Sequence, residues 1–260
     1  MLVTTKLVAI TRAVSPQIGQ CELTHLQRQA IDIKRAQAQH GHYEACLAGL
    51  GCQLHRLPAE PDLPDSVFVE DTAVVLDELA IITRPGAASR RPETESIARA
   101  LSPFRRLAFI RPPGTLDGGD LLRIGRMLYI GLSGRSNPVG IDQMRELVEP
   151  FGYQVEGVPV GGCLHLKSAA TQVAEDAVLI NREWVDGRVF RGLKRIDVYP
   201  EEPLGANALL VSGTVIYPAA WPRTRRRLEE AGIAVQTVDV SELTKAEGGV
   251  TCCSLILKEL

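Results

Sequence analysis

The stretch EGGVTCCSLIL, residues 247–257, places two adjacent cysteines between a glycine pair and an apolar run that is typical of a β-strand. Packing in the core is one explanation, because free cysteine is among the most buried residue types. We favour another, in which Cys252 opens the strand as a nucleophile at the mouth of a site. Cys253 then faces the opposite side of that strand and packs in the core.

His165 in CLHLKS is the candidate acid–base residue. Leu164 and Leu166 on either side predict an alternating strand, with the imidazole facing away from both leucines. A hydrogen-bonded structural histidine is the alternative. In a catalytic site the imidazole would protonate a leaving group and then activate water.

Carboxylates gather in two short stretches. Asp117 and Asp120 flank two glycines in LDGGD, which is either a plain turn or an acid positioned to orient an imidazole. Asp65, Glu70 and Asp71 lie in DSVFVED, where alternating apolar residues indicate partial burial rather than a solvated loop. Buried carboxylates need partners, and a guanidinium with its fork of donors would satisfy them.

Two arginines complete the set of candidate residues. Arg90 in PGAASRRP and Arg135 in LSGRSN each follow a predicted hairpin. Most single arginines are surface residues, but an amino-acid substrate also needs its α-carboxylate bound, and arginine does this with two parallel hydrogen bonds. The acids would then hold the cationic end of the substrate and the arginines its anionic end.

The elements that must position these residues recur along the chain. Hairpin patterns with turn residues at their centres are predicted at 71–85, 120–132, 171–181 and 207–218. Helices follow three of them, at 92–104, 138–152 and 221–233, while the third unit has room only for a short helix. Single strands close the four units, at 107–110, 153–160, 195–200 and 233–240.

The two ends of the chain predict a fifth unit. A strand at 251–259 would pair with one at 6–13, followed by a helix at 24–50 and a closing strand at 53–59. Five strand–strand–helix–strand units favour a closed α/β ring, which leaves no open sheet edge, over a doubly wound sheet, in which strands and helices alternate singly. We expect residues 1–260 to form one domain whose equivalent loops converge at one end of the ring.

Composition narrows the class of protein. Hydrophobic content is 45%, charged content is 23% and the formal net charge is −2, which are ordinary values for a globular protein. Basic residues are interspersed, so we expect no nucleic-acid partner. No apolar segment is long enough to span a bilayer, so we expect no membrane span. The six cysteines form neither a C-x-x-C pair nor a disulfide framework, so we expect no structural zinc site and a cytoplasmic setting.

With these residues in view, the chain resembles the dimethylarginine dimethylaminohydrolase family of the guanidine-modifying pentein superfamily. The matching stretches are LPDSVFVEDTAVV, ITRPGAASRR, TLDGGDLL, GLSGRSN, LHLKS and VTCCS. The resemblance implies a five-bladed α/β propeller, with Cys252 as nucleophile, His165 as acid–base residue and Asp117 as the supporting acid. It also implies substrate contacts from Leu23, Asp65, Glu70, Asp71, Arg90, Arg135 and Ala246.

The implied reaction converts N-omega-methylated arginine to citrulline and a methylamine through a covalent cysteine-thiouronium adduct, with no cofactor and no metal. Two positions depart from the family: Glu247 stands where aspartate is common, and Gly249 where an apolar residue is common. Hydrolysis of plain arginine or another guanidino compound stays an alternative, as does a propeller that only binds. The oligomeric state stays open.

Overall fold

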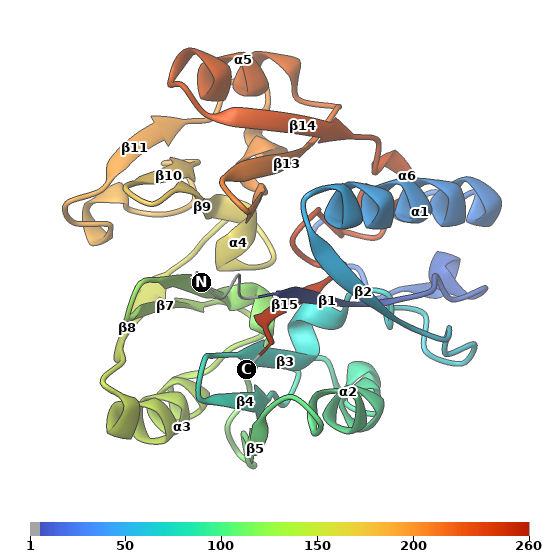
Figure 1. Ribbon diagram of the computed structural model, residues 1–260, viewed down its shortest axis with the longest axis vertical. Helices are drawn as coiled ribbons and strands as arrows, with labels where there is room; N and C mark the ends of the chain where they lie inside the picture. Colours follow the sequence, from blue (N-terminus) through green and yellow to red (C-terminus); the bar gives the residue numbers. More distant parts are fainter. Residues whose placement is uncertain (1–5, 260) are drawn as a thin grey trace.

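The computed structural model describes residues 6–259, which form five three-stranded sheets arranged in a ring (Figure 1). Each sheet consists of an antiparallel strand pair, which is a hairpin in four of the five sheets, and a third strand that runs parallel to one strand of that pair. A parallel neighbour requires a crossover connection, which is why a helix follows the hairpin in most units. The observed order is the predicted repeat of strand, strand, helix and strand.

The two units that follow the first closing strand are the most regular. The first of them consists of β3 (Ala73–Val75), β4 (Leu79–Ile82), α2 (Glu93–Leu101) and β5 (Arg106–Phe109). The second consists of β6 (Leu121–Ile124), β7 (Met127–Leu132), α3 (Pro138–Val148) and β8 (Gln154–Pro159). Helices α2 and α3 lie on the outside of the ring in Figure 1.

The next two units differ in their connections. One contains β9 (Ala170–Ala174), β10 (Ala177–Ile180) and β11 (Lys194–Asp197), joined by a single 3₁₀ turn at Gly187–Val189, as the short predicted helix anticipated. The other contains β12 (Leu209–Val211), β13 (Thr214–Pro218), α5 (Pro222–Glu230) and β14 (Ala234–Val238). Its hairpin turns at Ser212 and Gly213, whose φ angles of 49° and 79° are both positive, as a type I′ turn requires.

The two ends of the chain share the fifth sheet. Strand β15 (Leu255–Lys258) pairs antiparallel with β1 (Leu7–Arg12), and β1 pairs parallel with β2 (Cys52–Leu57) after helix α1 (Ile33–Gly49). The ring is therefore closed by hydrogen bonds between segments far apart in sequence. Two short helices, α4 (Leu166–Ala169) and α6 (Ser241–Thr244), lie outside the repeat.

The helix predicted at 24–50 was wrong in its first part, because α1 begins only at Ile33. Asp32 caps it by accepting a hydrogen bond from the backbone N–H of Arg35. Before it, the backbone N–H groups of residues 24–26 bind the Glu247 carboxylate instead of forming a helical turn. A contact with the other end of the chain thus overrides local helix propensity.

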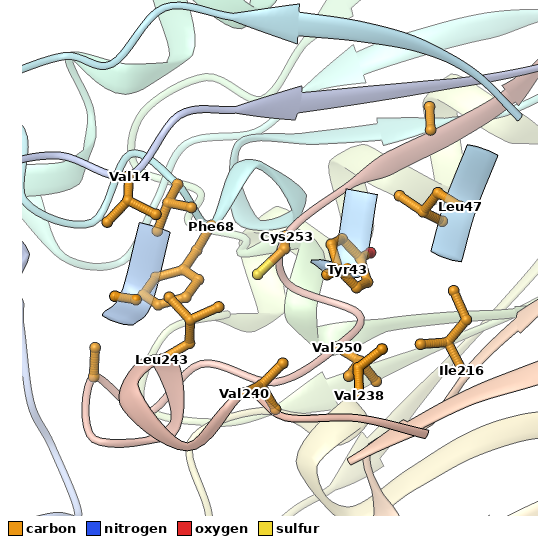
Figure 2. Close-up of a cluster of buried hydrophobic side chains, with 14 of the residues drawn as sticks. Val14, Tyr43, Leu47, Phe68, Ile216, Val238, Val240, Leu243, Val250 and Cys253 are labelled. Atoms are coloured by element: carbon orange, nitrogen blue, oxygen red, sulfur yellow. The ribbon is translucent and has the colours of Figure 1, made fainter. Parts of the chain in front are cut away.

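Several hydrophobic clusters separate the sheets from their helices. One of them joins the first and last units and contains Tyr43, Phe68, Leu243, Val250 and Cys253 (Figure 2). Among residues 6–259, none of the helices combines the length and apolar character needed to cross a bilayer.

Candidate active site

A small enclosed cavity of about 20 Å³ lies where loops from different units meet. Its lining residues are Glu22, Asp65, Phe68, Asp71, Arg90, Arg135, Leu164, His165, Ala246, Glu247, Gly248 and Cys252. The ring therefore brings all but four of the candidate residues to one place. The exceptions are Leu23, Glu70, Asp117 and Asp120, whose contacts are described below.

His165 has an extended backbone conformation and directly precedes α4. The prediction that it lies on an alternating strand was therefore wrong. The Asp120 carboxylate accepts the N–H of Leu166 at 3.0 Å and so holds the first turn of this helix. The same carboxylate accepts hydrogen bonds from Ser133 and Ser136, each at 2.6 Å. Asp120 thereby fixes the backbone that carries the imidazole.

Both ring nitrogens of His165 face carboxylates. Nε2 lies 3.0 Å from Oδ2 of Asp117, and Nδ1 lies 3.8 Å from Oδ1 of Asp71. Burial by itself lowers an imidazole pKa, but here the surrounding acids, with Asp71 the strongest, outweigh it and raise the pKa of His165 to about 9. At neutral pH the ring is an imidazolium that can donate a proton.

Asp71 is held in its charged form by several donors. Arg90 Nη1 donates to its Oδ2 at 2.5 Å, and the backbone N–H of Gly119 donates to its Oδ1 at 3.0 Å. Burial alone would raise the pKa of this carboxyl, yet His165 and Arg90 together lower it to about 2. Gly119 allows this approach, because a Cβ there would lie 2.6 Å from both Asp71 and His165.

Asp117 is fully buried behind the imidazole rather than in the cavity wall. Its Oδ1 accepts the N–H of Gly86 at 2.8 Å, while Oδ2 faces His165. Arg135 Nη1 lies 3.7 Å from the same Oδ2. The LDGGD stretch therefore orients an imidazole, as one of the two interpretations of its sequence proposed.

Cys252 lies in a turn that precedes β15, so the prediction that it opens the strand was wrong. The N–H of Gly249 points to its Sγ at 3.3 Å, and its carbonyl accepts the N–H of Glu70 at 3.1 Å. Burial, followed by the negative charges of Glu70 and Asp71, raises the pKa of the Cys252 thiol to about 12. The side chain is a neutral thiol until a cation reaches it.

The adjacent Cys253 has the opposite environment. Its side chain is 1% exposed and lies between Phe68 and Tyr43 in the hydrophobic cluster of Figure 2. Cys252 thus lines the cavity while Cys253 packs in the core, and a turn, not strand alternation, separates the two side chains.

The two candidate arginines differ in how many of their hydrogen-bond donors are already used within the protein. Arg90 lines the cavity, but it donates to the carboxylates of Asp71 and Glu93 and to the carbonyls of residues 65 and 68. Arg135 donates to Thr24 Oγ1 at 3.0 Å and otherwise faces Asp117. Arg135 therefore has more donors left for a ligand, and Arg90 mainly holds Asp71 in place.

Glu70 points away from the cavity. Its carboxylate accepts hydrogen bonds from Lys167 Nζ at 2.5 Å and Thr251 Oγ1 at 2.8 Å. All three residues line a separate cavity of about 350 Å³ that does not include His165 or Cys252. Glu70 therefore links the loops beneath the site through Lys167 and Thr251. Lys167 was not among the candidate residues predicted from sequence.

A lid formed by residues 22–26 covers the cavity. The N–H of Glu22 donates to Asp65 Oδ2 at 3.0 Å, and the Glu22 carboxylate accepts from Ser89. Glu247 accepts the N–H groups of residues 24–26 at 2.5 to 3.1 Å. Leu23, which lies on this lid, packs against the cluster of Figure 2.

The role of Glu247 as a lid acceptor was missed, although its departure from the family's usual aspartate was noted. The longer side chain reaches three consecutive amides, and its own backbone has a positive φ of 58°. The sequence predicted a helix for residues 24–26, which Glu247 binds. The extra methylene of Glu247 was therefore the one sequence feature that pointed to this contact.

One group of ligand atoms has the composition of a metal site. Atoms from Asp71, Asp117 and His165 lie within 4.8 Å of one another. The same atoms are already joined through the imidazole, which is protonated at neutral pH and repels a cation. The expectation of no metal and no cofactor stays a prediction.

Known proteins resemble this chain over nearly its whole length. The N(G),N(G)-dimethylarginine dimethylaminohydrolase of Streptomyces coelicolor is 39% identical over 254 residues, which cover 97% of each chain. The solved structure of dimethylarginine dimethylaminohydrolase from Pseudomonas aeruginosa, a cysteine-to-serine mutant complexed with citrulline, has a TM-score of 0.92 at 34% identity. It covers 97% of this chain and 99% of that one.

A second solved structure is an adduct of a histidine-to-glycine dimethylarginine dimethylaminohydrolase variant with S-methyl-L-thiocitrulline. It has a TM-score of 0.92 at 35% identity and covers 98% of this chain and 100% of that one. No protein-family model matches the chain. These similarities confirm the predicted five-bladed α/β propeller and the family that the sequence motifs indicated.

Proposed function

We propose that this chain, which belongs to the dimethylarginine dimethylaminohydrolase family, hydrolyses N-omega-methylated arginine to citrulline and a methylamine. The observation that carries the proposal is the joint lining of one acidic, lid-covered cavity by the thiol of Cys252 and the imidazolium of His165. A nucleophile and a proton donor at one cation-binding site are what guanidine hydrolysis requires.

Charge decides how the substrate binds in this proposal. The guanidinium lies against Asp71, while Asp65 receives the amino end together with the lid backbone around Leu23 and the loop at Ala246. Arg135 binds the α-carboxylate, and Arg90 contributes the one Nη1 N–H left beside its bond to Asp71. Glu70 acts from the floor through its negative charge.

Binding of the cation also activates the nucleophile. Glu70 and Asp71 raise the pKa of the Cys252 thiol, and the positive charge of a guanidinium beside the sulfur opposes that effect. The thiol proton leaves to solvent, and the thiolate attacks the central guanidinium carbon. The carbon–nitrogen bond to the methylated nitrogen breaks, and His165 gives its proton to the departing amine.

The second half of the reaction reverses the role of His165. Its neutral imidazole takes a proton from water, and the resulting hydroxide attacks the thiouronium carbon. The carbon–sulfur bond breaks and the hydroxyl proton passes to the departing sulfur, which releases citrulline and regenerates the Cys252 thiol. Asp117 orients the ring throughout and stabilises its charged form. No cofactor takes part in these steps.

The competing functions make different predictions for one assay. Citrulline formation is measured with asymmetric dimethylarginine, monomethylarginine and plain arginine, using the native chain and Cys252→Ser. We expect higher kcat/KM for the methylated substrates and a loss of about a thousandfold or more in the serine variant.

Preference for plain arginine would replace the proposed substrate with the rival guanidino compound. Absence of citrulline from all three compounds would favour a propeller that only binds. Retained turnover in Cys252→Ser, with the fold intact by circular dichroism, would remove the proposed nucleophile.

A further inference from the structure

Another cavity, separate from the one at Glu70 and larger than the proposed substrate site, also borders Cys252. Its volume is about 310 Å³, compared with about 20 Å³ for the lid-covered cavity. The two cavities share four lining residues, namely Leu164, Glu247, Gly248 and Cys252. The sulfur proposed to attack the substrate therefore stands at the boundary between a small polar space and a wide one.

The wide cavity has a mostly apolar, aromatic lining. Trp184 and Trp221 contribute their indole rings, and they are the only two tryptophans of the 260-residue chain. Leu204, which is 37% exposed, stands at its rim, and Leu26 of the lid also lines it. Such a lining suits an aliphatic or aromatic group and offers it large rigid contact surfaces.

Charge is nearly absent from the wide cavity. The single carboxylate in its lining belongs to Glu247, and that group is occupied by the backbone N–H groups of the lid. The acids and arginines of the site line the small cavity instead. Within residues 6–259, the wide cavity has no aspartate or arginine in its lining to pair with the α-amino and α-carboxylate groups of an amino acid, so it does not duplicate the substrate site.

The boundary residues give the direction in which a substrate substituent would point. Leu164 immediately precedes His165, the proposed proton donor to the departing nitrogen, and Leu164 lines both cavities. The shared boundary at Leu164 offers a group attached to that nitrogen a path out of the small cavity toward the two tryptophans. The small cavity, at about 20 Å³, leaves far less room for such a group than the wide cavity does, at about 310 Å³.

We propose that the wide cavity is a subsite for the substituent on the departing nitrogen, and that the enzyme hydrolyses arginines carrying larger apolar N-omega groups, of which propyl is the simplest test. This inference rests on the proposed function and extends its substrate class. The chemistry is unchanged: the bond to the substituted nitrogen breaks, His165 supplies the proton, water supplies the ureido oxygen, and the larger amine departs.

The first test measures binding without turnover. Because both tryptophans line the wide cavity, intrinsic fluorescence of Cys252→Ser reports its occupancy directly. We expect N-omega-propyl-L-arginine to change the emission and to bind about tenfold more tightly than N-omega-methyl-L-arginine, which reflects burial of two further methylenes. Equal affinities with unchanged emission would overturn the proposal.

The second test measures turnover in a variant with a narrowed rim. Leu204→Trp places a large side chain at an exposed position and touches none of the proposed catalytic residues. We expect kcat/KM for the propyl substrate to fall about tenfold while that for the methyl substrate changes less than about twofold. Trp184→Ala supplies a second variant, for which we expect the propyl compound to lose its affinity advantage.

The outcomes separate this inference from the function on which it rests. Hydrolysis of the methyl compound with no hydrolysis of the propyl compound overturns the subsite and leaves the proposed function standing. No citrulline from either compound overturns the proposed function. An equal loss for both substrates in Leu204→Trp also overturns the subsite, because the rim would then act on the whole site.

Discussion

Two buried histidines have opposite charge states, and the difference shows what makes this site reactive. His40 on α1 is 0% exposed and His165 is 4% exposed, so burial is nearly the same. Burial, aided by the positive charge of Arg56, lowers the pKa of His40 to about 4. Carboxylates around His165 raise the pKa of that ring to about 9 instead.

The neighbours of His40 explain why it stays neutral. Neither of its ring nitrogens has a hydrogen-bond partner within the described residues. The Glu44 carboxylate lies 3.6 Å from Nδ1, but it already accepts from Thr11 and pairs with Arg56. A buried imidazole becomes a proton donor where the negative charges facing it outweigh its desolvation, which is the case at His165.

The largest effect is expected when His165 is replaced. His165→Asn removes the proton donor, and kcat for citrulline formation should fall about 10² to 10⁴-fold. His40→Leu is the comparison variant, because it removes an equally buried imidazole and should keep kcat within about twofold. Similar losses in both variants would mean that burial, and not the ring of acids, defines the reactive histidine.

A smaller effect is expected when one acid is neutralised. Asp117→Asn keeps the shape of the side chain but removes a negative charge 3.0 Å from His165 Nε2, so the pKa of His165 should fall below 9. NMR titration of the imidazole measures the shift, and kcat should drop about tenfold. The surface variant Asp142→Asn is the control; an unchanged titration in Asp117→Asn would contradict the electrostatic account.

The two histidines also predict opposite pH dependences of stability. His40 has a lower pKa when folded than when unfolded, so its contribution is present above about 6.5 and is lost as pH falls towards 4. The difference between 6.5 and about 4 corresponds to about 3 kcal/mol in the free energy of unfolding.

Urea unfolding between pH 4 and 7 measures this slope, which should flatten in His40→Leu and persist in the exposed variant His42→Leu. His165 acts in the other direction, because its pKa is raised when folded. Its contribution is present below about 6.5 and is lost as pH rises through 9. If the free energy of unfolding of His40→Leu still falls between pH 7 and pH 4, groups other than His40 cause the loss of stability in acid.

The smallest effect concerns the lid. Glu247→Gln weakens the acceptor for the backbone N–H groups of residues 24–26, and alkylation of Cys252 by iodoacetamide should become about three- to tenfold faster. The imidazole of His165 should titrate as before, since its acids are untouched. The exposed Glu146→Gln is the control; a shifted His165 titration would show that enclosure contributes to its charge.

Much of the fold could be predicted because each repeat depends on residue preferences that act over a few neighbouring positions. Turn residues such as Ser212 and Gly213 interrupt apolar runs in every unit, and capping residues mark helix starts. Candidate residues were found by type and by resemblance, and most of them do line one cavity. The predictions of one domain over residues 1–260 and of a cytoplasmic setting stay predictions.

The number of units, their order and the kinds of reactive group follow from patterns along the chain. The state of those groups follows from the folded ring: Cys252 lies in a turn, Arg90 is bound by Asp71 and Glu93, and Glu247 binds the lid. Propensities and turns act over a few residues, so they can be read along the chain. Charge, burial and lid contacts depend on atoms that approach only when the ring closes, and no local pattern encodes those distances.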